Sequence, residues 1–185
     1  SDVYKRQMHD LHPVFNKFSR DPRLEEISRD IGVTEPEIWQ SMYIFKQPRI
    51  GDQVDWHQDA SYFATRPNTV KAFWFAIDDA TQENGCLWVA KKCSQLRQQF
   101  IVENGKSSMK PLDDEAWPEL EDAIPLEVSA GSLIVFDGLL PHFSSPNTSN
   151  FSRHAYTLHV VDGEAEYSRQ NWLQRKDSFP VRGFS

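Results

Sequence analysis

Cysteine is scarce in this chain, and a long hydrophobic run is absent. The two cysteines, Cys86 and Cys93, are seven positions apart. This spacing fits neither a C-x-x-C redox pair nor a zinc clamp, so we expect reduced thiols. No apolar run approaches the ~20 residues that span a bilayer, and the first residues lack the apolar stretch of a signal peptide. We therefore expect a cytoplasmic protein with no membrane partner. A targeting signal stays an open alternative, because the opening residues look unlike the start of a complete protein.

An excess of positive charge is also absent, since 20 lysines and arginines face 27 acidic residues for a net charge of -7. This balance argues against a nucleic-acid partner and against polybasic attraction to membranes. With 39% hydrophobic and 12% aromatic residues among 185, the chain can bury one sizeable core but hardly two. We expect residues 1–185 to form a single domain.

Helical signals are concentrated near the start of the chain. Residues 21–32 are expected to form a helix, with Asp21 as N-cap, Pro22 in the first turn and Gly32 closing the end. We expect this helix to pack outside a sheet.

From residue 41 onward, short aromatic and β-branched runs separated by turn signals predict strands. The predicted strands are 41–46, 69–77, 86–90, 132–136 and 153–161. This pattern favours a mainly β protein, either a sandwich or a jelly roll, with flanking helices. The polar segment 103–122 is expected to be a surface insertion, or a loop with one short helix.

His57, Gln58 and Asp59 form an H-x-D triplet in a strand-like stretch. Residues i and i+2 of a strand share a face, so His57 and Asp59 can offer a nitrogen and an oxygen to one ion. His142 follows the apolar run 131–136, which we expect to lie beside the strand of the triplet, and would complete a facial triad. Such a triad leaves coordination positions open, which suits non-haem Fe(II) with O2. The alternatives are a chance triplet and an ordinary histidine at a strand end.

Arg153 opens the run Arg-His-Ala-Tyr-Thr-Leu-His-Val. If its side chain faces inward, Ala155 and Thr157 face inward too and leave room for a ligand. A buried arginine needs an anionic partner, and the distal carboxylate of a 2-oxo acid is a suitable one. The alternative is a surface arginine paired with an acid.

The remaining histidines are expected to stay outside the metal site. His154 has the opposite parity to Arg153 and should point outward, while His159 lies about 20 Å further along an extended strand. His9 and His12 precede the predicted sheet and are expected at the surface.

Segments along most of the chain, from about Met8 to Trp172, carry a family resemblance. They are residues 40–48, 57–61, 79–88 and 153–157. Together they resemble the phytanoyl-CoA dioxygenase family, and within it the branch of the domain-containing protein 1.

The resemblance implies a double-stranded β-helix of the jelly-roll or cupin-like type. It also implies Fe(II), 2-oxoglutarate as co-substrate and O2, with turnover to succinate and CO2 coupled to hydroxylation of a small molecule, an acyl-CoA or another. By position in the family pattern, the metal ligands are His57, Asp59 and His142. The co-substrate contacts implied in the same way are Arg153, Ser144, Met42, Gln58 and Trp74.

The chain departs from the family pattern at two places. Lys91-Lys92-Cys93-Ser94 stand where relatives carry a turn resembling Pro-Gly-Ser-His. Residues 1–7 do not fit the family register and look like a truncated or foreign end, so Lys5 receives no role. Lys91, Lys92, Arg97 and Lys106 could form a basic rim for a coenzyme A ester, or simply a solvated edge.

Three alternative functions stay open from the sequence. A halogenase would need a chloride where Asp59 places a carboxylate. A zinc hydrolase could use two histidines and one carboxylate but has no need of Arg153. A non-catalytic jelly-roll module could bind metal or sense a ligand without turnover.

Overall fold

The structure is a computed structural model, and it describes residues 3–92 and 95–184. Its strands are β1 (Val3–Arg6), β2 (Pro36–Lys46), β3 (Val54–His57), β4 (Thr65–Arg66), β5 (Lys71–Ala76), β6 (Leu87–Ala90), β7 (Gln98–Glu103), β8 (Lys106–Pro111), β9 (Ala123–Leu126), β10 (Leu133–Asp137), β11 (His142–Ser144), β12 (Arg153–Asp162) and β13 (Glu166–Tyr167). The α-helices are α1 (Met8–Leu11), α2 (Pro13–Ser19) and α3 (Pro22–Asp30), and the 3-10 helices are η1 (Asp59–Ser61) and η2 (Leu120–Asp122).

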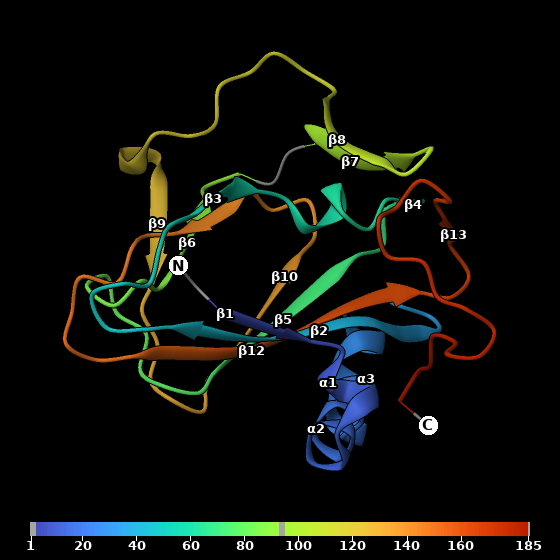
Figure 1. Cartoon of the computed structure of the whole chain (residues 1–185), viewed down its shortest axis with the longest axis horizontal. Helices are drawn as coiled ribbons and strands as arrows, with labels where there is room; N and C mark the ends of the chain where they lie inside the picture. The colour runs from blue at the N-terminus through green and yellow to red at the C-terminus, as the bar shows by residue number, and fades with distance from the viewer. Residues whose placement is uncertain (1–2, 93–94, 185) are drawn as a thin grey trace.

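Two antiparallel sheets face each other (Figure 1). The large sheet has the order β1-β2-β12-β5-β10, and the small sheet has the order β3-β11-β6-β9. Strand β12 is central in the large sheet, because β2 pairs along one edge and β5 along the other. The prediction of a mainly β jelly roll with flanking helices is confirmed, and each predicted strand corresponds to a strand with shifted ends.

The helices lie against the outer face of the large sheet (Figure 1). Asp21 caps α3 by accepting a hydrogen bond from the Arg23 backbone N–H, and Gly32 follows the helix at φ 88°, as the sequence predicted. Leu24 of α3 packs with Tyr156 and Leu158 of β12 in one buried cluster. In the described part of the chain, no helix is long and apolar enough to cross a membrane.

Successive side chains of β12 point to opposite faces of the large sheet, one toward the helices and the other toward the small sheet. Tyr156, Leu158 and Val160 face the helices and join the cluster that contains Leu24. The other face of the strand carries Arg153, Ala155, Thr157 and His159, which are all buried. The inward direction of Arg153, Ala155 and Thr157 agrees with the expectation from parity.

Part of the predicted surface insertion 103–122 is instead a hairpin. Strands β7 and β8 pair from Gln98↔Pro111 to Glu103↔Lys106, and only η2 matches the short helix that was expected. The turn residues Asn104 and Gly105 have φ values of 52° and 74°, which suit a two-residue hairpin turn. Asn-Gly was the available signal, and the hairpin was missed because most of β8 is exposed and lacks an apolar alternation.

The expectation of a surface position for His9 is wrong. His9 is fully buried, and its Nδ1 lies 2.8 Å from the Ser41 hydroxyl. Its neighbour Asp10 is buried among cations from distant segments: Arg20 Nη2 at 2.9 Å, Arg182 Nη2 at 2.7 Å, and Arg175 in close contact. This Asp10 cluster ties α1 to the C-terminal segment, which explains why histidine and aspartate are buried here.

Candidate metal centre

Strand β3 and the turn after it place two of the predicted ligands on one side. His57 ends β3, Gln58 keeps an extended backbone with φ -121° and ψ 133°, and Asp59 begins η1. The extended Gln58 turns its neighbours to the same face, as expected of i and i+2 positions. The backbone therefore brings an imidazole and a carboxylate to one place.

His142 comes from a strand that the sequence did not reveal. The expected neighbour of the triplet, the apolar run 131–136, forms β10 and pairs with β5. His142 instead begins the short strand β11, in which it is the cross-strand partner of His57. A strand of only 3 residues gives no periodic signal, so this pairing could not be read from the sequence.

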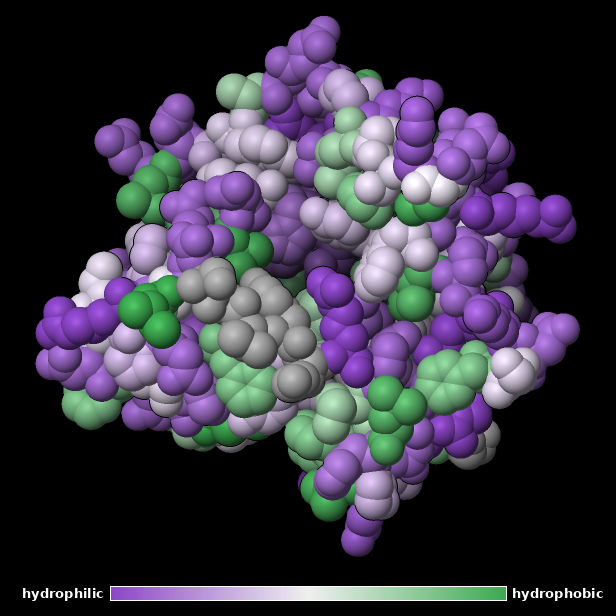
Figure 2. Space-filling model, viewed as in Figure 1, coloured by the Kyte–Doolittle hydropathy of each residue, from purple (hydrophilic) through white to green (hydrophobic). Residues whose placement is uncertain are grey.

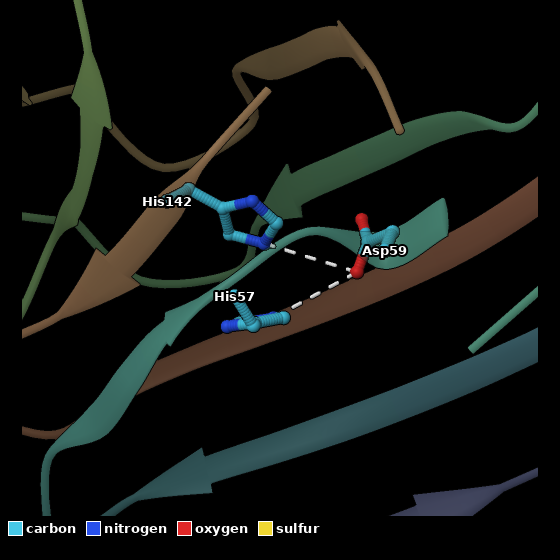
Figure 3. A group of neighbouring side chains, drawn as sticks. All are labelled: His57, Asp59 and His142. Atoms are coloured by element: carbon cyan, nitrogen blue, oxygen red, sulfur yellow. Dashed lines mark ion pairs between the residues drawn. The ribbon is translucent and has the colours of Figure 1, made fainter. Parts of the chain in front are cut away.

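The three side chains converge (Figure 3). Their candidate ligand atoms all lie within 4.8 Å of one another. Asp59 Oδ1 is 3.7 Å from His57 Nε2 and 3.8 Å from His142 Nε2. Asp59 and His142 are buried, whereas His57 is partly exposed. Two imidazoles and one carboxylate on one side of an ion leave further coordination positions open.

Hydrogen bonds fix the tautomers of the two histidines. His57 Nδ1 lies 2.8 Å from the Asp55 carbonyl, and His142 Nδ1 lies 3.0 Å from the Leu140 carbonyl. A carbonyl only accepts, so each Nδ1 carries the proton and each Nε2 offers a lone pair to the site. This tautomer is the one that a metal ligand needs.

The ionisation states also suit a cation. Burial, reinforced by nearby His57, lowers the pKa of His142 to about 4. Burial alone would raise the pKa of Asp59, but the surrounding histidines outweigh it and hold that pKa well below its ordinary value. At neutral pH the centre therefore contains an anionic carboxylate beside a neutral imidazole.

A narrow inner cavity of about 70 Å³ adjoins the three side chains. Four of the predicted co-substrate contacts line it: Met42, Trp74, Ser144 and Arg153. Arg153 is 1% exposed, donates from Nε to the Gly85 carbonyl at 2.9 Å, and lies 5.5 Å from the centre of the Trp74 ring. The structure thus brings a fixed guanidinium and the candidate metal ligands to the same cavity.

Gln58 does not reach this cavity. Its amide donates to the carbonyls of Leu139 at 2.6 Å and Gln95 at 3.1 Å, and its oxygen accepts from the Arg97 backbone N–H at 2.9 Å. The alternation that aligns His57 with Asp59 necessarily turns Gln58 away from them. Its side chain thus joins the loops at Gln95, Arg97 and Leu139, and its contact with the co-substrate stays a prediction.

His159 is a site residue that the sequence reasoning missed. Its Nε2 lies 3.3 Å from Asp59 Oδ1, and the residue is 3% exposed. His159 does not join the group of three candidate ligands, as expected, but its contact with Asp59 was not foreseen, because distance along β12 does not limit contact with the facing sheet. Its parity with Arg153 was the signal that could have found it. His154 follows the expectation and takes no part in the cavity lining.

A wider outer cavity of about 540 Å³ opens beyond the metal side chains, and Figure 2 shows a hollow on this face between the sheets. Aromatic side chains form much of its wall: Trp56, Tyr62, Phe63, Phe100 and Trp172. His57, Asp59 and His159 line this cavity as well as the inner one. Two of the three candidate ligands, His57 and Asp59, therefore lie at the junction of the two cavities.

The basic rim proposed from the sequence lacks one of its members. Arg97 is buried, with its guanidinium 3.0 Å from Asp113 and 4.4 Å from the Trp117 ring centre. Lys91 pairs with Asp122 at 3.5 Å.

Cys86 is buried and reduced, as expected, whereas Cys93 and Ser94 lie outside the described residues.

Comparison with known sequences gives consistent matches. The sequence model of the phytanoyl-CoA dioxygenase (PhyH) family matches residues 2–155. A phytanoyl-CoA dioxygenase domain-containing protein 1 homolog of Dictyostelium discoideum is 38% identical over 94% of this chain and 64% of its own length. Phytanoyl-CoA dioxygenase 1 of Oryza sativa subsp. japonica is 41% identical over 91% of this chain and 60% of its own length. The chain thus spans less than two thirds of these relatives.

Solved structures share the fold at low sequence identity. The non-haem alpha-ketoglutarate-dependent carbocyclase SnoK has a TM-score of 0.73 at 17% identity, over 98% of this chain and 76% of its own. EctD from S. alaskensis, solved with 2-oxoglutarate and 5-hydroxyectoine, has a TM-score of 0.67 at 20% identity, over 93% of this chain and 58% of its own. These similarities establish the jelly-roll architecture.

Proposed function

Because this chain belongs to the phytanoyl-CoA dioxygenase family, we propose that it is an Fe(II)- and 2-oxoglutarate-dependent dioxygenase. The reaction converts 2-oxoglutarate and O2 to succinate and CO2 and hydroxylates a small organic molecule. One observation carries the proposal: two imidazole lone pairs and one carboxylate converge at a cavity that also contains a buried arginine. The solved relatives named with 2-oxoglutarate support the same assignment.

In this proposal, five polar side chains of the inner cavity bind the metal or the co-substrate. His57 and His142 hold Fe(II) through Nε2, and Asp59 holds it through a carboxylate oxygen. Arg153 binds the distal carboxylate of 2-oxoglutarate with Ser144 beside it, because a guanidinium offers paired donors to a carboxylate. When bound, the iron and 2-oxoglutarate supply the oxidising chemistry, and the protein positions them.

The inner cavity suits the co-substrate, and the outer cavity suits the substrate. Trp74 and Met42 restrict the inner cavity and shield the Arg153 charge from water, which strengthens its attraction for a carboxylate. The outer cavity is the place for the substrate, because it is larger and reaches His57 and Asp59. A substrate in the outer cavity would need to place its reacting C–H bond at the junction of the two cavities, beside His57 and Asp59.

Anaerobic absorption spectroscopy tests the proposal. Addition of Fe(II) and 2-oxoglutarate should produce a metal-to-ligand charge-transfer band, and His57→Ala or Asp59→Ala should abolish it. His154→Ala is a matched control, because His154 lies outside the lining of the inner cavity, and it should keep the band. Absence of the band in the parent protein would overturn the proposal.

Product analysis separates the proposed enzyme from the alternatives. Succinate formed from 2-oxoglutarate in the presence of O2 identifies a dioxygenase. A zinc hydrolase would contain zinc by metal analysis and consume no O2, and a non-catalytic module would form no succinate. A substrate screen that compares succinate with hydroxylated product then identifies what is oxidised.

A further inference from the structure

Three histidines surround the Asp59 carboxylate, and one of them differs from the others in its hydrogen bonds. The Nε2 atoms of His57, His142 and His159 lie 3.7, 3.8 and 3.3 Å from Asp59 Oδ1. The first two donate from Nδ1 to backbone carbonyls. Among the described residues, the buried Nδ1 of His159 has no hydrogen-bond partner. The hydrogen bonding of Nδ1 therefore distinguishes His159 from the other two histidines.

The missing acceptor determines the tautomer of His159. A buried N–H without an acceptor costs more than a buried lone pair without a donor, so the proton belongs on Nε2. This atom is the one that faces the carboxylate. His57 and His142 thus offer lone pairs to the centre, whereas His159 offers a proton to Asp59.

Packing holds the His159 ring in this orientation. Its ring stacks on Phe63 with 4.9 Å between centroids and 27° between planes, and Phe63 is 2% exposed. The backbone of β12 fixes the other end, because β2 and β5 pair with the strand at this residue. His159 is also outside the described group of side chains whose ligand atoms lie within 4.8 Å of one another. The ring is placed as a donor and not as a further ligand.

We propose that His159 is a positioning residue that donates from Nε2 to the Asp59 carboxylate and orients it for the metal. A carboxylate without such a donor can rotate about its side-chain bonds. A hydrogen bond to Oδ1, the oxygen that also lies nearest the Nε2 atoms of His57 and His142, would restrict that rotation. Partners of this kind typically change metal affinity by about 10- to 100-fold when they are removed.

This inference rests on the proposed function, and titration of the metal-free protein with Co(II) tests both separately. Visible absorption of the bound ion gives the affinity and reports the geometry of its ligands. His159→Leu should raise the Kd by about 10- to 100-fold and alter the absorption. His159→Gln should restore most of the affinity, because the glutamine amide can place a donor where Nε2 stands. His154→Leu, the same exchange at another position of β12, should leave the Kd unchanged.

The outcomes are distinct. If the parent protein binds no Co(II), both the proposed function and the role of His159 are overturned. If the parent binds and His159→Leu binds equally well, only the role of His159 fails. If the leucine and glutamine variants are equally weak, the ring acts by packing on Phe63 and the hydrogen bond is refuted. Thermal unfolding of each metal-free variant identifies one that fails to fold, and the glutamine variant then decides the question.

Discussion

His142 is the direct cross-strand partner of His57, and their ring centroids are 4.2 Å apart. Side chains directly opposite each other in an antiparallel pair share one face of the sheet. The pairing of β11 with β3 therefore sets the separation of the two imidazoles before any ion arrives. Asp59, at the start of η1 after β3, supplies the third candidate ligand.

Metal binding should stabilise the fold without being required for it. A ligand present at about 100 times its Kd stabilises the folded state by about 2.7 kcal/mol. We therefore expect Co(II) at that ratio to raise the melting temperature of the parent protein and not that of His57→Ala. Differential scanning calorimetry checks this, with His154→Ala as the variant that should respond like the parent. An equal response of His57→Ala would place the bound ion elsewhere.

Arg153 should determine which 2-oxo acid is accepted. Truncation of one partner of a buried charge pair costs about 2 kcal/mol or more, so Arg153→Met should weaken 2-oxoglutarate binding by about 30-fold or more. A 2-oxo acid without a distal carboxylate, such as 2-oxobutyrate, should bind both proteins alike. Isothermal titration of the metal-loaded proteins measures both affinities. A similar loss for the two acids would show that Arg153 acts on the metal site and not on the distal carboxylate.

Gly85 should be less replaceable than Gly131, although both have a left-handed backbone with φ of 89° and 86°. A Cβ at Gly85 would lie 2.6 Å from the Ser145 carbonyl oxygen, whereas a Cβ at Gly131 meets no atom within 4 Å. Gly131→Ala should lose about 1–2 kcal/mol of stability from backbone strain alone. Gly85→Ala should lose more, and should weaken 2-oxoglutarate binding because the Gly85 carbonyl accepts from Arg153. Urea denaturation measures the stabilities, and equal losses would contradict the clash.

The sequence supported the metal site better than its surroundings, for geometric reasons. The i, i+2 rule placed His57 with Asp59, and parity placed Ala155 and Thr157 on the same face of the strand as Arg153. Parity also applied to His159, but distance along one strand gave no information about the facing sheet. Strand β11 was too short to show any period. These two misses at the site therefore depend on contacts between distant segments, which no local pattern contains.

Asp10 should make folding stability sensitive to acid. Burial alone would raise its pKa, but hydrogen bonds from His9, Arg182 and Arg175 outweigh burial and hold it well below the ordinary value of 3.8. A depressed folded-state pKa gives stability that is present above 3.8 and is lost as the pH falls further. Asp10→Asn should cost about 3–5 kcal/mol at neutral pH, because it leaves buried cations without their anion.

Urea denaturation between neutral and acidic pH provides the measurement. The parent should lose stability on acidification, and the Asp10→Asn variant should start lower and lose less. Asp30→Asn, at the exposed end of α3, is the control and should follow the parent. A variant with a pH profile parallel to that of the parent would assign the acid sensitivity to another carboxylate.

The cross-strand placement of His57 and His142 belongs to a fold whose buried clusters contain no metal ligand. The buried clusters that hold the sheets and helices together are built from apolar side chains such as Phe73, Leu158 and Val161, and none of them needs an ion. The polypeptide can therefore reach its final shape first and acquire iron afterwards. Occupancy of the metal site is then not a condition for folding, and the metal content of the folded protein can vary with the metal supplied to it.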